Sequence, residues 1–337
     1  MARFAIIISA TVALIITSLL GFILIPCLRK LHFGQTIKEI GPTWHKNKQN
    51  TPTMGGLMFI VGVIIALILS YVYMVFHMNE QDAFISDVKF QNMFLAIITS
   101  LAFGFVGFVD DYIKVIKKRN LGLLARYKII MQTLITIIFL ASLFLNKTST
   151  TIINIPFIGF VDFGFFYYIF SFLLIVGMVN AVNLTDGIDG LASSVTFFVM
   201  IGFIIITSLT GEFVISLFAS AVAGAVAGFL IWNAYPAKVF MGDVGSMFLG
   251  GVVSTIAFCI NRPELLFFMG IIYICEAGSV VIQMTYFKIT KGKRIFKMSP
   301  IHHHFELSGW SENKIVTIFS AVTIAGVILS CIFVYIS

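Results

Sequence analysis

Long apolar segments separated by short polar loops dominate the chain. None of these segments shows the period-two alternation of apolar and polar residues that marks a half-buried strand. A run of about 20 apolar residues is long enough to cross the hydrocarbon core of a bilayer as a helix. The pattern predicts ten spans, at residues 4–25, 55–76, 92–109, 128–145, 165–182, 191–210, 213–232, 244–260, 264–287 and 314–336.

Composition supports a membrane protein rather than a water-soluble one. Of the 337 residues, 59% are hydrophobic and only 11% are charged, against roughly a quarter charged in soluble domains. Because lipid offers no hydrogen bonds to the backbone, the spans must be helices or a closed barrel, and the length of the runs selects helices. The predicted fold class is therefore an all-α polytopic membrane protein, with one small external hairpin expected near residues 150–163.

The positive charge is distributed unevenly between the loops. The net charge of +7 could suggest a nucleic-acid partner, but 18 of the 22 Lys and Arg residues lie in the loops that follow odd-numbered spans. Basic residues are enriched in cytoplasmic loops, where they set orientation and favour anionic lipid. We therefore expect no nucleic-acid partner, a membrane-lipid environment, both termini outside, and the odd-to-even loops in the cytoplasm.

Carboxylates collect on the predicted cytoplasmic side. Five of the eight aspartates lie at helix ends on this side: Asp110, Asp111, Asp186, Asp189 and Asp243. Clustered carboxylates repel one another unless a cation or a shared proton lies between them. Oxygen ligands of this kind suit Mg²⁺ or Mn²⁺ bound together with phosphates. One such aspartate alone is as often a solvated interfacial residue as a functional one.

Three local features favour a site over mere solvation. The pair Asp110–Asp111 follows the apolar run 105–109 without a break, so it begins close to the hydrocarbon boundary. Residues 180–190 form a polar, turn-rich segment between two long spans. Asp243 lies between glycines at the start of a helix, where free N–H groups attract phosphate.

Histidine and lysine residues add candidates for phosphate binding. Residues 302–304 are three consecutive histidines, which cannot all face one metal; one or two would face a phosphate or nucleotide, or the segment is a solvated loop. Lys48, ahead of the Thr-Pro-Thr-Met-Gly-Gly segment, offers a point charge or is an ordinary basic anchor. Glu276 lies near the middle of the ninth span, where a charge is costly, and either a structural or a relay role fits it.

Taken together, the motifs resemble the phospho-N-acetylmuramoyl-pentapeptide-transferase family of the polyprenyl-phosphate N-acetylhexosamine-1-phosphate transferase superfamily. The resemblance extends from the first span to the last. It rests on TPTMGG at 51–56, FVDDYIK at 108–114, NAVNLTDGIDGLA at 180–192, NAYPAKVFMGDVGS at 233–246 and PIHHHFELSGW at 300–310. The aspartate motifs point only to the superfamily, whereas TPTMGG and PIHHHFE narrow it to the muramoyl-pentapeptide branch.

The resemblance implies a membrane enzyme of bacterial peptidoglycan synthesis, in the cytoplasmic membrane with its active site facing the cytoplasm. It would transfer phospho-MurNAc-pentapeptide from UDP-MurNAc-pentapeptide to undecaprenyl phosphate, giving lipid I and UMP, with Mg²⁺ as cofactor. A homodimer is expected on the same ground. The chain would be a single domain, 1–337, whose loops 26–54, 110–127, 183–190, 233–243 and 288–313 form the active site.

Residue roles follow from the same resemblance. Asp243 is the expected metal ligand and also a catalytic residue. The other expected catalytic residues are Asp110, Asp111, Lys114 and His302. The expected substrate-binding residues are Lys48, Thr53, Lys128, Asn180, Asn183, Asp186, Asp189, Asn233, Phe240, Gly242, Gln283, His303 and His304.

Two rival functions fit parts of the pattern. A sister transferase that uses UDP-N-acetylglucosamine would share the aspartate motifs. A secondary transporter would also have about ten spans, but transporters place substrate-binding charges near the membrane midplane, and here only Glu276 lies mid-span. The distribution of charge therefore favours an enzyme.

Overall fold

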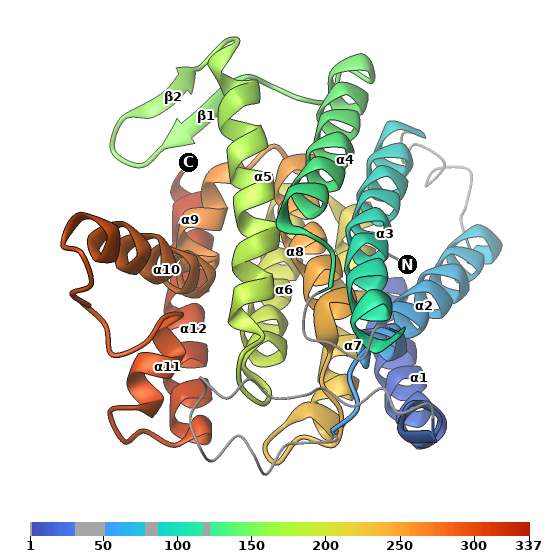
Figure 1. The fold of residues 1–337 in the computed structure, drawn as a ribbon. Coiled ribbons are helices and arrows are strands. Elements are labelled where there is room, and N and C mark those ends of the chain that lie inside the picture. Colours follow the sequence, from blue (N-terminus) through green and yellow to red (C-terminus); the bar gives the residue numbers. More distant parts are fainter. Residues whose placement is uncertain (1, 31–50, 78–86, 117–121) are drawn as a thin grey trace.

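The computed structural model describes residues 2–30, 51–77, 87–116 and 122–337, which form a helical bundle with one small hairpin (Figure 1). The long helices are α1 (Ala2–Lys30), α2 (Gly56–His77), α3 (Asp87–Ile116), α4 (Ala125–Leu145), α5 (Phe166–Thr185), α6 (Leu191–Thr210), α7 (Phe213–Asn233), α8 (Gly242–Cys259), α10 (Ile271–Ile289) and α12 (Glu312–Ile336). The short elements are β1 (Ile152–Ile155), β2 (Gly159–Asp162), the 3-10 turn η3 (Pro263–Leu265), α9 (Leu266–Met269) and α11 (Ile301–Glu306). The predicted all-α membrane fold is confirmed.

Nine of the helices in the described parts are long and apolar enough to cross a membrane, and the bent pair formed by Pro263–Met269 and α10 makes a tenth candidate. Nine predicted spans correspond to straight helices. The ninth predicted span, 264–287, does not: its two parts meet at 80°. Gly270 lies at the break, and the backbone N–H of Gly270 bonds back to Leu266 at 2.9 Å, which closes α9 before α10 begins.

Helices α7 and α8 form the centre of the bundle, and every residue of α8 from Val244 to Cys259 is buried. Glycine allows their neighbours to approach closely. A Cβ at Gly224 would overlap the carbonyl of Ala10, and one at Gly228 would lie 2.6 Å from the carbonyl oxygen of Leu14. Small residues at this spacing let helix backbones pack against each other in lipid, so helix α1 lies directly on α7.

The packing of α3 on α8 fixes the position of the aspartates. Helix α3 continues to Ile116, so Asp110 and Asp111 lie within its last two turns rather than at its end. At Gly107, one turn earlier, a Cβ would overlap the backbone carbonyl of Asp243. The close approach at this glycine therefore brings the first turn of α8 against the aspartate pair of α3.

The predicted hairpin is confirmed as an antiparallel pair in which Ile152 faces Asp162; its external location stays a prediction. It lies at one end of the bundle, and α11 lies at the opposite end (Figure 1). The C-terminus is at the hairpin end, since Arg262 donates to the hydroxyl of Ser337 at 3.4 Å. The cytoplasmic orientation of the opposite end stays a prediction from the loop charges.

Candidate active site

Three carboxylates from two helices, two of them buried and one partly exposed, meet at the end of the bundle opposite the hairpin. Asp110 and Asp111 come from α3 and are 4% and 3% exposed, and Asp243 comes from the first turn of α8. One oxygen of each lies within 4.8 Å of an oxygen of the other two. The aspartates are 133 positions apart in the sequence at most, so the α3–α8 packing alone brings them together.

Two lysines neutralise much of this charge. The ammonium of Lys114 lies 2.6 Å from Asp110 Oδ2, 3.0 Å from Asp243 Oδ2 and 3.4 Å from Asp111 Oδ1. The ammonium of Lys128, in the first turn of α4, lies 3.3 Å from the same oxygen of Asp243. Three carboxylates against two ammonium groups give a formal charge of −1, which either a shared proton or one further cation would balance.

Neutral donors hold each carboxylate in place. The side-chain amide of Asn183 donates to Asp243 Oδ1 at 2.8 Å and also to Ser246 Oγ at 2.8 Å. The backbone N–H of Val244 donates to Asp111 Oδ2 at 3.1 Å, so the free N-terminus of α8 binds a carboxylate of α3. The backbone N–H of Leu123 donates to Asp110 Oδ1 at 2.8 Å.

The donor set fits a hard divalent cation. Mg²⁺ takes oxygen ligands at about 2.1 Å, so ligands on opposite sides of the ion are about 4.2 Å apart. The three aspartate oxygens lie within 4.8 Å of one another, near enough to share one ion after a small adjustment of the side chains. Because Lys114 already contacts all three carboxylates, a cation bound by them requires its ammonium to withdraw.

The segment before α2 is paired with the segment before α8 through the main chain. Phe240 N–H donates to the carbonyl of Pro52 at 2.8 Å, Gly55 N–H to that of Phe240 at 2.8 Å, and Gly56 N–H to that of Met241 at 2.9 Å. The side chain of Thr53 is 7% exposed. This pairing places Thr53, Phe240 and Gly242 beside the carboxylates.

Gly242 is the tightest point of this arrangement. Its φ is +72°, a conformation that favours glycine. A Cβ here would lie 2.5 Å from Asp111 Oδ2 and 2.8 Å from the hydroxyl of Thr53. The glycine therefore lets Asp111 reach the N-terminus of α8.

The loop between α5 and α6 carries the two remaining aspartates. Burial, followed by the carboxylates of Asp243, Asp111 and Asp189, raises the pKa of Asp186 well above its usual range. Asp186 is thus close enough to the three aspartates to interact electrostatically with them. Asp189 accepts from the backbone N–H of Ala237 at 2.9 Å, which joins the 183–190 loop to the 233–243 loop.

Two predicted substrate-binding amides, Asn180 and Asn233, form hydrogen bonds within the protein. Asn180 and Gln132 exchange two hydrogen bonds, at 2.8 and 3.3 Å, between α5 and α4. Asn233 accepts from Ser193 at 2.8 Å and donates to the carbonyl of Val239 at 3.0 Å. These side chains shape the loops around the site, and their direct contact with a substrate stays a prediction.

The side chain of Gln283, another predicted substrate-binding residue, also forms hydrogen bonds within the protein. Its carbonyl accepts from the N–H groups of Ile295 and Phe296 at 3.0 and 3.1 Å, and its amide donates to the carbonyl of Phe296 at 3.1 Å. It therefore fixes the start of the segment that leads to the histidines.

The three histidines of α11 point to three different partners. His302 Nδ1 lies 2.9 Å from Glu276 Oε2, and His303 Nδ1 lies 2.6 Å from Glu306 Oε2. His304 Nδ1 accepts from the backbone N–H of Lys297 at 3.1 Å. The prediction that they cannot share one metal agrees with this geometry. Lys48 lies outside the residues that the structure describes.

Sequence reasoning missed several residues of the site. Ser246, Gln132 and the backbone N–H of Leu123 all hold predicted site residues, and none stands out by type or spacing. Ser246 lies one turn after Gly242 and back-bonds to its carbonyl at 3.0 Å. In the sequence, only its position in the polar segment around Asp243 indicates that Ser246 belongs to the site.

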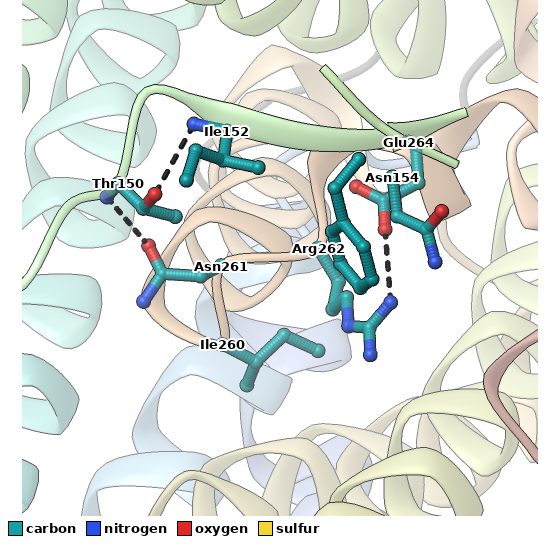
Figure 2. A pocket seen from close by; sticks show the side chains of 8 residues that line it. Thr150, Ile152, Asn154, Ile260, Asn261, Arg262 and Glu264 are labelled. Atoms are coloured by element: carbon teal, nitrogen blue, oxygen red, sulfur yellow. Dashed lines mark hydrogen bonds and ion pairs between the residues drawn. The ribbon is translucent and has the colours of Figure 1, made fainter. Parts of the chain in front are cut away.

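A separate cavity of about 290 Å³ lies at the hairpin end, between β1–β2 and η3 (Figure 2). Asn261 accepts there from the backbone N–H of Thr150 at 3.3 Å, and Arg262 donates to Glu264 at 3.5 Å. The cavity is at the far end of the bundle from the three aspartates, so the cluster and not the cavity is the candidate active site.

Comparison with known proteins agrees with the motifs. A family model described as glycosyl transferase family 4 matches residues 93–261, and a phospho-N-acetylmuramoyl-pentapeptide-transferase signature matches residues 48–60. A phospho-N-acetylmuramoyl-pentapeptide-transferase of Clostridium novyi is 45% identical, with 94% of this chain and 93% of the relative covered. Proteins of the same description from Halalkalibacterium halodurans and Listeria monocytogenes serovar 1/2a are 44% and 43% identical. They cover 91% and 96% of this chain, and 91% and 97% of the relatives.

Proposed function

Because the chain belongs to the phospho-N-acetylmuramoyl-pentapeptide-transferase family, we propose that it makes lipid I. It transfers phospho-MurNAc-pentapeptide from UDP-MurNAc-pentapeptide to undecaprenyl phosphate and releases UMP. The observation that carries the proposal is the cluster of Asp110, Asp111 and Asp243, with two lysines in contact, at one end of a membrane bundle.

The reaction joins two anions, so the first task of the site is to neutralise charge. An oxygen of the lipid phosphate attacks the sugar-bearing phosphorus of the donor, and the bond from that phosphorus to the bridging oxygen breaks. The electron pair leaves with UMP. Lys114 and Lys128, both in contact with Asp243, place positive charge where the two phosphates would meet. Catalysis of this type depends on positioning and electrostatics.

We further propose Mg²⁺ as the cofactor, with Asp243 as a direct ligand and with Asp110 and Asp111 completing the carboxylate set. When bound, the ion neutralises the diphosphate and the charge that develops on departing UMP. Asn183 and Ser246 orient the Asp243 carboxylate for this role through their chain of hydrogen bonds. Such supporting bonds are typical of metal sites.

The geometry of Asp110 supports an orienting role rather than that of a general base. One oxygen accepts from the Leu123 N–H and the other is 2.6 Å from the Lys114 ammonium. A carboxylate whose two oxygens both bond to donors is held in one orientation. The lipid phosphate has a second pKa near 6 and is largely dianionic at neutral pH, so it can attack without losing a proton to Asp110.

The cluster should face the cytoplasm of the bacterial inner membrane. The loops at its end of the bundle carry most of the basic residues. A soluble nucleotide would then reach Asp186 and the 183–190 loop from the cytoplasm, while the polyprenyl tail enters sideways from the bilayer.

The decisive test is a matched assay of purified protein in undecaprenyl phosphate micelles with either UDP-MurNAc-pentapeptide or UDP-N-acetylglucosamine. We expect UMP release only with the first donor, and only with a divalent cation added. Asp243→Asn should lower turnover at least 100-fold, whereas Asp162→Asn, an exposed aspartate in the hairpin, should not. Normal turnover by folded Asp243→Asn protein, or turnover with UDP-N-acetylglucosamine alone, would overturn the assignment.

A further inference from the structure

A second acidic group lies next to the site and has no role in the chemistry above. Glu276 lies on α10 and is fully buried, and its Oε2 is 2.9 Å from Nδ1 of His302, which is fully buried as well. The two residues come from different helices, 26 positions apart. The partner of the mid-span glutamate is therefore a histidine that the family resemblance places in catalysis.

The Glu276–His302 contact orients the imidazole ring. We assign the shared hydrogen to Nδ1 of His302, the arrangement in which the Glu276 carboxylate accepts. The other nitrogen, Nε2, is buried and has no hydrogen-bond partner among the described residues. A buried polar nitrogen without a partner is destabilising, so the bond to Glu276 holds the ring in an orientation that leaves Nε2 available to a ligand.

The free nitrogen points at the loop that carries the donor-side aspartates. A Cβ at Gly187, between Asp186 and Asp189, would overlap Nε2 and Cε1 of the His302 ring. The edge of the imidazole thus lies directly against the backbone of this loop. Nε2 is therefore placed beside the loop at which a donor phosphate is proposed to bind.

The bend in the ninth predicted span explains why Glu276 can reach this place. Helix α10 is turned by 80° from the preceding segment and packs against α5, α11 and α12. From α10, Glu276 reaches His302 on α11. Along a straight span the same residue would lie at mid-membrane with no polar neighbour given by the sequence.

We propose that Glu276 is a positioning residue: its carboxylate accepts from Nδ1–H of His302, so that Nε2 faces the 186–189 loop. With a hydrogen on both ring nitrogens, the imidazolium donates from Nε2–H to the phosphate of the UMP moiety while Glu276 balances its charge. The inference rests on the proposed transferase function and adds to it the group through which His302 is oriented. Removal of the carboxylate frees the ring to rotate and weakens the bond to the phosphate without touching the uridine.

The test is a double-mutant cycle of Glu276→Gln and His302→Ala, read out by turnover and by binding of UMP and uridine. Glu276→Gln should lower kcat about 10- to 100-fold, the usual effect of removing a supporting hydrogen bond. It should weaken the binding of UMP and leave the affinity for uridine unchanged. In the His302→Ala protein the same change should have no further effect. Glu276→Asp, which keeps the charge, should recover part of the loss.

Glu264→Gln is the matched control, because Glu264 is also a buried acid but pairs with Arg262 at the hairpin end. It should leave turnover and UMP affinity unchanged. The proposal is wrong if Glu276→Gln protein with a normal Tm binds UMP and turns over like the wild type, or if Glu276→Gln weakens UMP equally with and without His302. If His302→Ala abolishes turnover, the double-mutant cycle is evaluated from UMP affinity alone. A wild-type protein without transferase activity would refute the proposed function instead.

Discussion

Replacement of Gly107 by alanine should separate the aspartates from one another without removing any of them. The added Cβ would overlap the carbonyl of Asp243 and lie 2.7 Å from the nitrogen of Val244. All of these are backbone atoms, so no side chain can rotate away. Helices α3 and α8 must separate by roughly 1 Å before the new methyl reaches ordinary contact distance.

The expected loss has two parts. Overpacking costs about 1–3 kcal/mol of stability, offset by about 1 kcal/mol because alanine favours a helix over glycine. A displacement of about 1 Å at a catalytic group lowers turnover about 100-fold. Gly107→Ala should therefore lose far more activity than stability.

Thermal unfolding and UMP release, measured on the same detergent-solubilised protein, check this expectation. Gly177→Ala is the control, because Gly177 lies on α5 and a Cβ there meets nothing within 4 Å. It should keep full activity and gain about 0.5–1 kcal/mol of stability. Turnover of Gly107→Ala within twofold of the wild type would refute the argument that α3–α8 contact holds the aspartates in place.

Three further changes test the charges and the loop. The pKa of Asp186 in the folded protein lies above its unfolded value, so stability falls as pH rises from the usual carboxyl range through the folded pKa. Asp186→Asn should make the Tm of metal-free protein in detergent less dependent on pH over this range. An unchanged slope of Tm against pH would contradict this expectation. Lys114→Met removes the ammonium shared by three carboxylates, so the metal-free variant should be about 1–3 kcal/mol less stable than the wild type. Added Mg²⁺ should raise the Tm of the variant more than that of the wild type. An equal rise in Tm would show that the lysine does not compete with the ion. Gly187→Ala should push aside the imidazole of His302 and lower kcat, whereas normal kcat would show that the loop yields freely.

Much of the fold was predictable because the bilayer imposes simple rules. Apolar length located nine straight helices and the β-branched stretch located the hairpin. The sequence did not reveal that α3 continues through Asp110 and Asp111, since a polar pair after an apolar run also reads as a helix end. Nor did it show the break at Gly270, because glycine is common inside membrane helices.

The aspartates of the site were predictable as a group, but their contacts were not. Topology placed Asp110, Asp111 and Asp243 on one side of the membrane. That they touch depends on the close approach at Gly107, which only the packed structure shows. The pairing of Glu276 with His302 depends in the same way on the bend before α10. Long-range contacts of this kind leave no local pattern in a single sequence.

The main-chain pairing of residues 52–56 with 240–241 has a consequence for exchanging parts between relatives. Its three hydrogen bonds use backbone groups, so substitutions at Pro52 and Phe240 can leave them intact. The glycines cannot be substituted independently, because a Cβ on Gly56 would overlap the backbone of Gly245. A chimeric protein should therefore exchange 51–56 and 239–245 together, since the two segments behave as one inherited unit although almost 200 positions separate them.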